Sequence, residues 1–250
     1  DEYACIPARN AGMCVPSLSG KPMPLNDPDA TNDEEWIRIA TVSVNTIRDS
    51  VVSIPLSLDG PPICPNMTDS TFRKRMLELR DEAVAVTRQR IRELARWSPA
   101  TEARVIDWFG TSDIETRRTL INGLDALADV MARLDARNFV RTGSDADRAT
   151  GCLPNMKNLD AEVAHVCRPD TSTHTIAISL PFCSLPERSA GNLSSQQLTI
   201  VHECTHFDDT FNAVDHSGAY GRTACMHFAK HHPNDALGNA DSIAWFILAR

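Results

Sequence analysis

The residues of this chain with the clearest chemical potential form one short segment, His202-Glu203-Cys204-Thr205-His206. Residues four apart lie on one face of an α-helix, so a helix through this segment would direct both imidazoles at a single ion. Glu203 would stand beside that ion rather than bind it. The pattern predicts a zinc site in which the metal lowers the pKa of a water and the carboxylate takes up its proton; two hydrogen-bonded core histidines are the alternative.

A catalytic zinc ion of this kind needs a third ligand from the protein. The metzincin pattern requires Gly and His where this chain has Asp209 and Asn212. The glutamate ligand of thermolysin-like enzymes is excluded, unless it lies upstream, because no Glu follows Phe207. An aspartate is therefore the predicted third ligand. The candidates downstream of the motif are Asp208, Asp209, Asp215, Asp235, Asp241, His216, His227, His231 and His232.

Further landmarks surround the motif. They are Trp108-Phe109-Gly110, Thr175-Ile176-Ala177-Ile178, Phe182-Cys183-Ser184-Leu185-Pro186, Asp215, Tyr220-Gly221, Asn239-Ala240-Asp241 and Phe246. Together with the motif, and in this order, they resemble the aspzincin metalloendopeptidases, the family of deuterolysin and the fungal peptidyl-Lys metalloendopeptidases. The resemblance spans roughly residues 64 to 250 and does not explain the residues before them.

The resemblance implies a role for each of five residues. His202, His206 and Asp215 would hold one Zn2+ ion and leave a coordination position for water. Glu203 would act as general base toward that water and then as acid toward the leaving amine. Tyr220 would donate its hydroxyl to the oxyanion that forms during hydrolysis.

The segment around the third ligand departs from the family pattern, which is Gly-Thr-x-Asp-x-x-Tyr-Gly. Residues 212–221 lack the Gly-Thr pair and carry two extra residues between Asp215 and Tyr220. The spacing from His206 to Asp215 is that of the family, which favours Asp215 as the ligand. Asp209 is the alternative, since it lies about one helical turn after His206.

Asp241 is the candidate substrate-binding residue. In the Lys-specific members, an aspartate at this position and a glutamate three residues later line the pocket for a basic side chain. This chain has Ala244 at the second position, as deuterolysin-like members do. The resemblance therefore implies a relaxed preference for basic or varied residues. A helix cap or a buried, hydrogen-bonding aspartate is the alternative role for Asp241.

The composition agrees with a secreted globular enzyme. With 250 residues, of which 42% are hydrophobic and 23% charged, the chain can bury one substantial core. Its eight cysteines form an even set without Cys-x-x-Cys pairs, which predicts up to four disulfides and an oxidising compartment.

The pairing of these cysteines is predicted only in outline. We expect Cys5 to pair with Cys14, because the two are close in sequence. Cys204 either pairs with Cys225 or stays free and buried. The other four cysteines are expected to tie the first core helix to a hairpin; they are Cys64, Cys152, Cys167 and Cys183.

The net charge of −8 disfavours binding to nucleic acid and favours cationic protein substrates. The sequence has no membrane-spanning apolar run and no signal peptide, which, with the cysteines, predicts a secreted protein whose leader has been removed. We expect a monomer that acts on protein or peptide substrates and binds neither nucleic acid nor membrane.

The pattern along the chain predicts an α+β fold that is mainly helical, a zincin-like catalytic domain with a small antiparallel sheet and disulfides. Proline and glycine between 54 and 62 separate two parts. Residues 1–63 would form a cysteine- and proline-containing extension with one helix over 33–52, and residues 64–250 the catalytic domain.

Within the catalytic domain the expected elements follow from periodicity and capping residues. We expect helices over 71–97, 114–134, 221–230 and 236–249, and strands between 138 and 183. Ser194 and Gln197 form a capping box that would open the helix of the metal motif.

Three functions fit these features. The favoured one is a secreted zinc endopeptidase of the aspzincin type. The second is a zinc-binding, antigen-like protein without turnover, which Glu203 and Tyr220 disfavour because a pure binder needs neither. The third is a secreted toxin or effector that cleaves one dedicated protein, with residues 1–63 as a delivery or recognition module.

Overall fold

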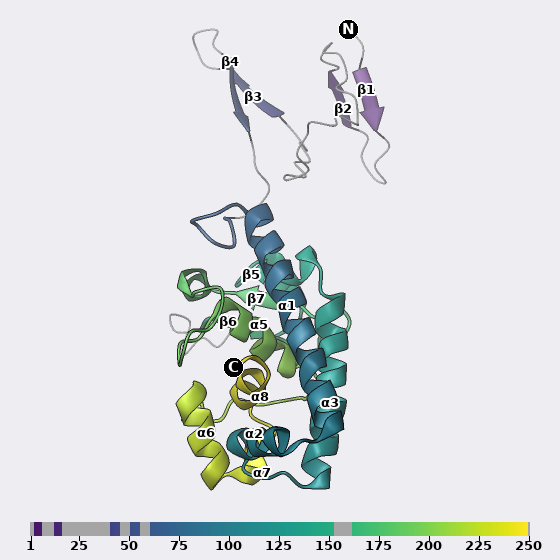
Figure 1. Cartoon of the computed structure of the whole chain (residues 1–250). Coiled ribbons are helices and arrows are strands. Elements are labelled where there is room, and N and C mark those ends of the chain that lie inside the picture. Colours follow the sequence, from purple (N-terminus) through teal and green to yellow (C-terminus); the bar gives the residue numbers. More distant parts are fainter. Residues whose placement is uncertain are drawn as a thin grey trace. The chain divides into compact units, whose positions relative to one another are not determined.

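The computed structural model of the chain describes residues 61–152 and 162–249, together with the backbone of four earlier strands (Figure 1). Asp1–Ile39 form one compact unit and Ala40–Arg250 a second. Strands β1 (Tyr3–Ile6) and β2 (Met13–Pro16) make an antiparallel pair in the first unit. Strands β3 (Thr41–Asn45) and β4 (Val51–Pro55) make another in the second unit.

Strands β3 and β4 show that the helix predicted over residues 33–52 is wrong where the two overlap. Both strands are rich in β-branched residues, which lose side-chain freedom in a helix and pack well on a pleated surface. The remaining residues of the predicted helix lie outside the described part of the chain. The domain boundary between residues 63 and 64 stays a prediction.

The two longest helices are α1 (Asp69–Arg96) and α3 (Ile114–Arg133), and they confirm the helices predicted over 71–97 and 114–134. Each begins at a side chain that accepts a hydrogen bond from the backbone three residues ahead, Thr68 for α1 and Asp113 for α3. The two helices pack against each other and bury their apolar faces between them and the rest of the core.

Helix α2 (Pro99–Phe109) lies between them in sequence and was not predicted. Ser98 caps its start, and its proline stands in the first turn, where no N–H is needed. It ends at Gly110, whose φ of 73° favours glycine. A Cβ at Gly110 would lie 2.1 Å from the carbonyl oxygen of Ala229, so glycine also permits a close approach between two segments.

A three-stranded sheet has the order β5 (Phe139–Arg141), β7 (Ile176–Ile178), β6 (Ala164–Val166). Strand β6 is antiparallel to β7, but β5 is parallel to it, so the sheet is mixed and not antiparallel as predicted. Parallel neighbours need a long connection. Here the connection from β5 to β7 contains α4 (Asp145–Ala149) and β6 itself.

Short 3-10 helices flank the sheet, η1 (Ala136–Asn138) before β5 and η2 (Leu180–Ser184) after β7. The C-terminal part is helical, with α5 (Gln196–Thr205), α6 (Arg222–His231), α7 (Pro233–Ala236) and α8 (Ala240–Leu248). The helices α6 and α8 correspond to those predicted over 221–230 and 236–249. The fold class is therefore as predicted, mainly helical with a small sheet.

Helix α5 lies at the centre of this arrangement (Figure 1). All ten of its residues are buried, and it contacts α1, α3, α8 and β6. Its cap is Ser195, whose hydroxyl accepts from the Leu198 N–H at 3.0 Å, one residue later than the predicted Ser194. A helix buried on every side holds its side chains in fixed directions, which a metal site requires.

Two disulfides connect the four cysteines that were expected to pair among themselves. Cys64–Cys183 joins the segment before α1 to η2, and Cys152–Cys167 links the residue after Gly151 to the residue that follows β6. The pair Cys204–Cys225 is not formed: both thiols are free and buried, which was the predicted alternative. The predicted pairing of Cys5 with Cys14 concerns side chains outside the described residues.

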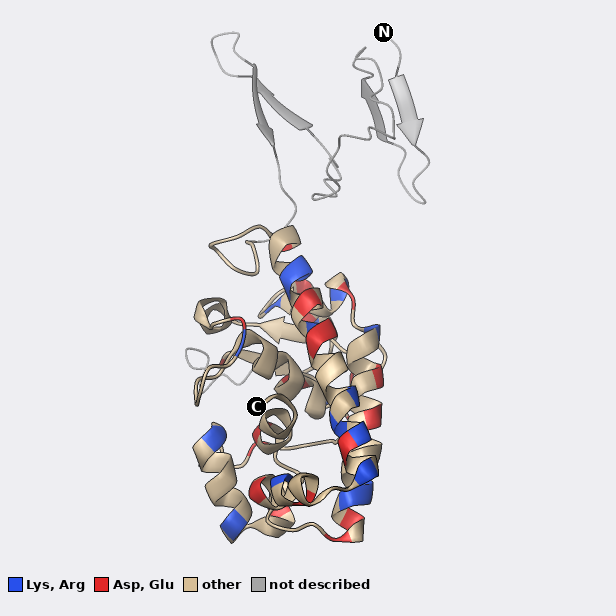
Figure 2. Cartoon of the chain, viewed as in Figure 1, with Lys and Arg blue, Asp and Glu red and all other residues tan. Residues whose placement is uncertain are grey.

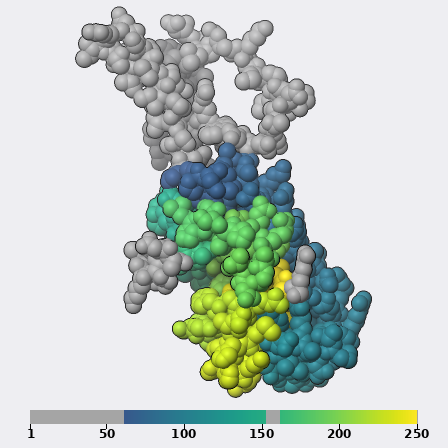
Figure 3. Space-filling model, turned by 60° about the vertical axis from the view of Figure 1, so that its left-hand side comes forward, coloured from purple at the N-terminus to yellow at the C-terminus, as the bar shows by residue number. Residues whose placement is uncertain are grey.

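The charged residues are concentrated on the helices that are partly exposed to solvent. Lys, Arg, Asp and Glu are frequent on α1 and α3, whereas α5 and α8 are almost free of them (Figure 2). On the face shown in Figure 3, the green part of the chain, to which β6 and β7 belong, adjoins the yellow part that contains the C-terminal helices. Among the described helices, none is long and apolar enough to cross a membrane.

Candidate metal centre

Helix α5 brings the two histidines of the motif together. Their Nε2 atoms are 3.2 Å apart, and their ring planes are nearly perpendicular, at 78°. His202 lies within the last turn of α5, and His206 is the residue that ends it, still in helical conformation. The sequence spacing therefore produces the predicted common face, with both Nε2 atoms directed at one point in space.

Asp215 reaches the same point from the segment that follows α5. The Ala213 N–H donates to the Thr205 carbonyl at 3.0 Å, and Val214 forms a parallel bridge with Asn239. These bonds fix the backbone directly before the third ligand candidate. The Asp215 carboxylate lies 3.2 Å from His202 Nε2 and 3.6 Å from His206 Nε2.

His202, His206 and Asp215 each offer one ligand atom, and these three atoms lie within 4.8 Å of one another. Two imidazole nitrogens and one carboxylate oxygen are the donor set of a catalytic zinc ion, which keeps its fourth position open. The residues present therefore fit a zinc ion. The predicted alternative, Asp209, instead accepts from His174 Nε2 with both carboxylate oxygens, at 3.1 and 3.0 Å.

The outer nitrogen of each imidazole is also engaged. His202 Nδ1 lies 2.9 Å from Asp241 Oδ1, and His206 Nδ1 lies 2.9 Å from the Ala213 carbonyl oxygen. Because a carbonyl oxygen only accepts, His206 carries its proton on Nδ1 and leaves the Nε2 lone pair free. Partners of this kind orient metal-binding imidazoles and raise their basicity.

The carboxylates also determine how the ligand candidates ionise. Burial disfavours the charged imidazole of His202, but hydrogen bonds with Asp215 and Asp241 outweigh it and raise its pKa to about 10. Burial likewise opposes ionisation of Asp215, yet its hydrogen bond with His202 and the nearby imidazoles lower its pKa. A cation that binds here must therefore displace a proton.

Glu203 is 6% exposed and lies between the two histidines in sequence. Burial raises the pKa of its carboxyl above the ordinary range, although His202 and His206 act in the opposite direction. A buried carboxyl with a raised pKa is suited to accept a proton and return it.

Tyr220 lies at the open side of the cluster and is 55% exposed. Its ring is stacked on that of His202, with 6.3 Å between the centroids, and its hydroxyl interacts with the charge of Asp215. Burial of part of the side chain and the charge of Asp215 raise the pKa of Tyr220. The phenol consequently remains a hydrogen-bond donor at neutral pH.

Asp241 is buried, and both of its carboxylate oxygens are occupied. Oδ1 pairs with His202 Nδ1, and Oδ2 accepts from the Gly221 N–H at 2.5 Å. These contacts match the predicted alternative of a buried, hydrogen-bonding aspartate. Ala244, one turn further along α8, is fully buried.

The sequence identified Asn239 only as part of the family resemblance, but in the structure its side chain holds the loop that follows Asp215. Its amide nitrogen donates to the Ala219 carbonyl and to the Ser242 hydroxyl, at 3.2 and 2.9 Å. Its amide oxygen accepts from the His216 N–H at 3.2 Å. The side chain thus fixes the loop that carries Asp215 and Tyr220, despite the two extra residues in that loop.

A second group of titratable residues near Glu203 was not predicted. His165 Nε2, on β6, lies 3.0 Å from Asp147 Oδ1, and its Nδ1 lies 3.3 Å from Glu162 Oε2. Burial, followed by the charges of Glu203 and Asp147, raises the pKa of Glu162, while His165 lowers it. The only sequence signal was a histidine among β-branched residues, which does not distinguish this group from a core histidine.

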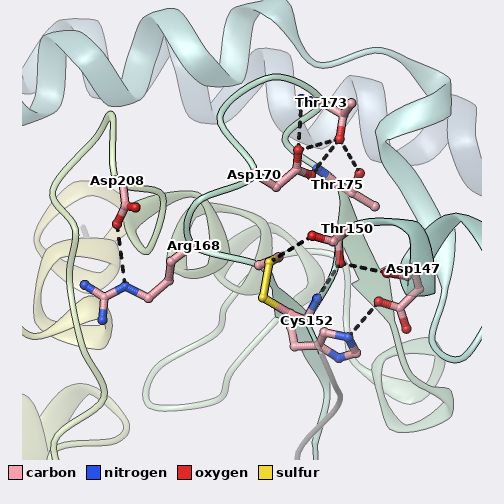
Figure 4. Close-up of a disulfide and its surroundings, with 10 residues drawn as sticks. Asp147, Thr150, Cys152, Arg168, Asp170, Thr173, Thr175 and Asp208 are labelled. Carbon is pink, nitrogen blue, oxygen red and sulfur yellow. Dashed lines mark hydrogen bonds and ion pairs between the residues drawn. A yellow bond between two sulfur atoms is a disulfide. The ribbon is translucent and has the colours of Figure 1, made fainter.

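A hollow of about 970 Å3 lies elsewhere, beside η1 and the segment 169–175. Its acidic residues already have partners: Asp135 pairs with Arg137, and Asp170 binds Thr173 and Thr175 (Figure 4). The disulfide Cys152–Cys167 lies next to this network (Figure 4). The hollow therefore offers no acid and base free to act together among the described residues.

Comparison with known proteins agrees with this geometry. The sequence model of the aspzincin family, described as lysine-specific metallo-endopeptidases, matches residues 95–248. This match covers more than half of the chain, which therefore belongs to the aspzincin family. The protein is a zinc metalloendopeptidase, and its substrates are proteins or peptides.

Among solved structures, the chain is similar to a zinc peptidase from Grifola frondosa. The two are 20% identical, with a TM-score of 0.53, and the similarity covers 71% of this chain and 94% of the other. At this identity the likeness shows a shared fold. No curated protein matches the sequence.

Proposed function

We propose that the protein hydrolyses peptide bonds at one zinc ion held by His202, His206 and Asp215. The observation that carries the proposal is the convergence of their three ligand atoms within 4.8 Å at the C-terminal end of a buried helix. Zinc bound there would polarise a water molecule and lower its pKa toward neutrality. Every other step falls to side chains of the chain itself.

Glu203 takes the proton from the attacking water and passes it to the leaving amine. Its burial and raised pKa support this role. A carboxyl with a raised pKa accepts a proton from water more readily than an ordinary one and can still pass it to an amine, which is the stronger base. Tyr220 donates its hydroxyl to the oxygen of the attacked carbonyl, where negative charge develops. Its exposed position and its protonated phenol support that assignment.

In this proposal Asp241 orients His202, because its Oδ1 lies 2.9 Å from His202 Nδ1, the ring nitrogen that would not bind the metal. The same contacts bear on specificity. With both oxygens of Asp241 engaged and alanine at position 244, these two positions do not supply a pair of free carboxylates that could bind a lysine side chain. We therefore infer a relaxed preference for basic or varied residues after the cleaved bond.

Two further parts of the proposal concern the whole protein. The two disulfides support secretion into an oxidising environment. Residues 1–63 are proposed as an extension to the catalytic domain 64–250, and the protein as a monomer that binds neither nucleic acid nor membrane. A broad peptidase would cleave denatured casein and basic proteins, whereas a dedicated effector would ignore them.

The decisive variant is Glu203→Gln. We expect the variant to keep its zinc content, because the glutamate is not a ligand. Its kcat should fall by a factor of about 10² to 10⁴. Metal analysis and mass-spectrometric mapping of peptide-library cleavage, with and without a chelator, measure both properties and the side-chain preference. Glu78→Gln, an exposed glutamate on α1, is the matched control.

Two results would contradict the proposal. Hydrolysis by Glu203→Gln at the wild-type rate would remove the base assignment. A wild-type protein that binds zinc but cleaves no peptide would support the antigen-like alternative.

A further inference from the structure

A second pair of histidines in this chain has the spacing of the metal motif. All eight histidines lie within the described residues, and only two pairs among them are four residues apart, His202 with His206 and His227 with His231. Both members of the second pair belong to α6 (Arg222–His231). Residues four apart on a helix project from the same face, one turn from each other.

The rings of the second pair are close enough to share a ligand. The centroids of His227 and His231 are 4.4 Å apart, with 42° between the ring planes. For His202 and His206, whose Nε2 atoms converge, the centroid distance is 4.9 Å. Both His227 and His231 are exposed, so an ion can reach them from solvent without rearrangement of the core.

The nitrogens of His227 and His231 are also free. Neither ring has a hydrogen bond or an ion pair with another residue in the described ranges, in contrast to His165, His174 and the two motif histidines. The neighbouring His232 instead stacks on Phe228, with centroids 4.8 Å apart. The lone pairs of the exposed pair are thus available for coordination.

We propose that His227 and His231 form a surface site for a divalent transition metal, with water completing the coordination shell. Two imidazoles without a carboxylate suit nickel, copper or zinc, whereas magnesium and calcium prefer oxygen ligands. Lys230 and Arg222 on the same helix oppose a cation by their charge. With two protein ligands and these charges, the site is weaker than the three-ligand centre and fills only when metal is in excess.

Occupation of the site has a structural consequence. An ion that bridges one turn of α6 stabilises the helix against fraying, since it binds the folded form and not the unfolded one. Helix α6 begins directly after Gly221, whose N–H donates to Asp241. This inference rests on the histidine geometry alone and holds whether or not the proposed catalytic roles are correct.

The test is calorimetric titration of the full-length, zinc-loaded protein with nickel chloride. We expect the wild type to bind one nickel ion, and His227→Ala and His231→Ala each to bind it about tenfold more weakly or not at all, because one imidazole loses the benefit of chelation. His232→Ala, an exposed histidine on the same segment, is the matched control and should bind as the wild type does. Magnesium chloride should give no binding heat.

Thermal unfolding provides the second readout. Nickel should raise the unfolding temperature of the wild type and of His232→Ala, but not that of the other two variants. Equal nickel binding by all four proteins would overturn the proposal, because it would place nickel elsewhere, for instance in exchange for the zinc. Loss of binding in His232→Ala alone would overturn it as well.

Discussion

The two carboxylate oxygens of Asp241 have different partners, His202 Nδ1 and the Gly221 N–H. In Asp241→Asn one carboxylate oxygen becomes an amide nitrogen that cannot accept, so the side chain can no longer accept from His202 Nδ1 and the Gly221 N–H together and orients His202 less firmly. We expect the affinity for zinc to fall by about 10- to 100-fold. Competition with a chromogenic chelator measures this change.

The same variant distinguishes the two roles considered for Asp241. If this residue binds basic substrate side chains instead, Asp241→Asn will raise KM for basic peptides relative to neutral ones and leave zinc affinity unchanged. Asp208→Asn serves as control, because Asp208 is half exposed and lies 3.9 Å from Arg168 in a surface ion pair. Such pairs contribute little.

Glu162 provides a prediction about pH. Its Oε2 atom is buried and forms an ion pair with His165 Nδ1 at 3.3 Å without hydrogen-bond geometry, and burial raises the pKa of the carboxyl above the value of 4.5 that it has when unfolded. A raised carboxyl pKa means that the folded state holds the proton more tightly, so ionisation at neutral pH reduces stability. We expect Glu162→Gln to increase the free energy of unfolding at neutral pH.

That gain should vanish as the pH falls below 4.5, where the carboxyl of the wild type is protonated in both states. Urea unfolding across this pH range, in the presence of a chelator, measures it. A gain that is independent of pH would show that packing rather than charge causes it. A loss of stability at neutral pH would show that the ion pair with His165 outweighs the cost of burial.

At the scale of elements, Gly110 decides how closely the end of α2 approaches α6. Gly110→Ala must accommodate a φ of 73° and a Cβ only 2.1 Å from the Ala229 carbonyl oxygen. The conformation alone costs about 1–2 kcal/mol, and the clash adds to it. We therefore expect a loss in the free energy of unfolding well above that range, measured by denaturant titration.

Gly143→Ala is the matched control for this prediction. Its φ is 75°, but a Cβ there would meet no atom within 4 Å. The difference between the two variants therefore isolates the clash. Equal losses would mean that α6 moves away from α2 without cost.

The elements differ in how well the sequence predicted them. Long amphipathic stretches with capping residues, such as α1 and α3, were found almost to the residue. In the sheet the parallel pairing of β5 with β7 depends on contacts between segments far apart in sequence, which local patterns do not encode. Ser195 caps α5 instead of Ser194, because adjacent serines offer the same local hydrogen bond and packing selects between them.

At the scale of the whole molecule, the two disulfides should differ in what they contribute. Cys64–Cys183 spans 119 residues and Cys152–Cys167 spans 15. Restricting the unfolded chain gives about 5 kcal/mol for a loop near the longer length and about 3 kcal/mol for the shorter one. We expect the double serine variant at 64 and 183 to lose more stability than that at 152 and 167.

Denaturant unfolding of the two double variants under the same conditions checks this order. The buried thiols of Cys204 and Cys225 remain reduced in both, so they do not affect the comparison. The opposite order would indicate that residual structure in the unfolded state, rather than loop length, determines the contribution.

The candidate site was largely readable from the sequence because its main motif is local. His202, Glu203 and His206 lie within five residues, and helical geometry alone sets the direction of their side chains. Asp215 followed from its spacing and from the family resemblance, although its loop is two residues longer than the family pattern. The roles of Asp241 and Asn239 could not be derived in this way, since their partners are about twenty to forty residues away.

The sequence by itself determined the family, the chemistry of the metal motif and the mainly helical character, because these depend on residue types at short spacing. The tertiary structure alone decided which cysteines pair, that Cys204 and Cys225 stay reduced, and that Asp241 bonds to His202. It also decided that Asp209 bonds to His174 while Asp215 joins the histidines. The physical reason is that these choices depend on distances across the folded core, which are set by the packing of all the helices together.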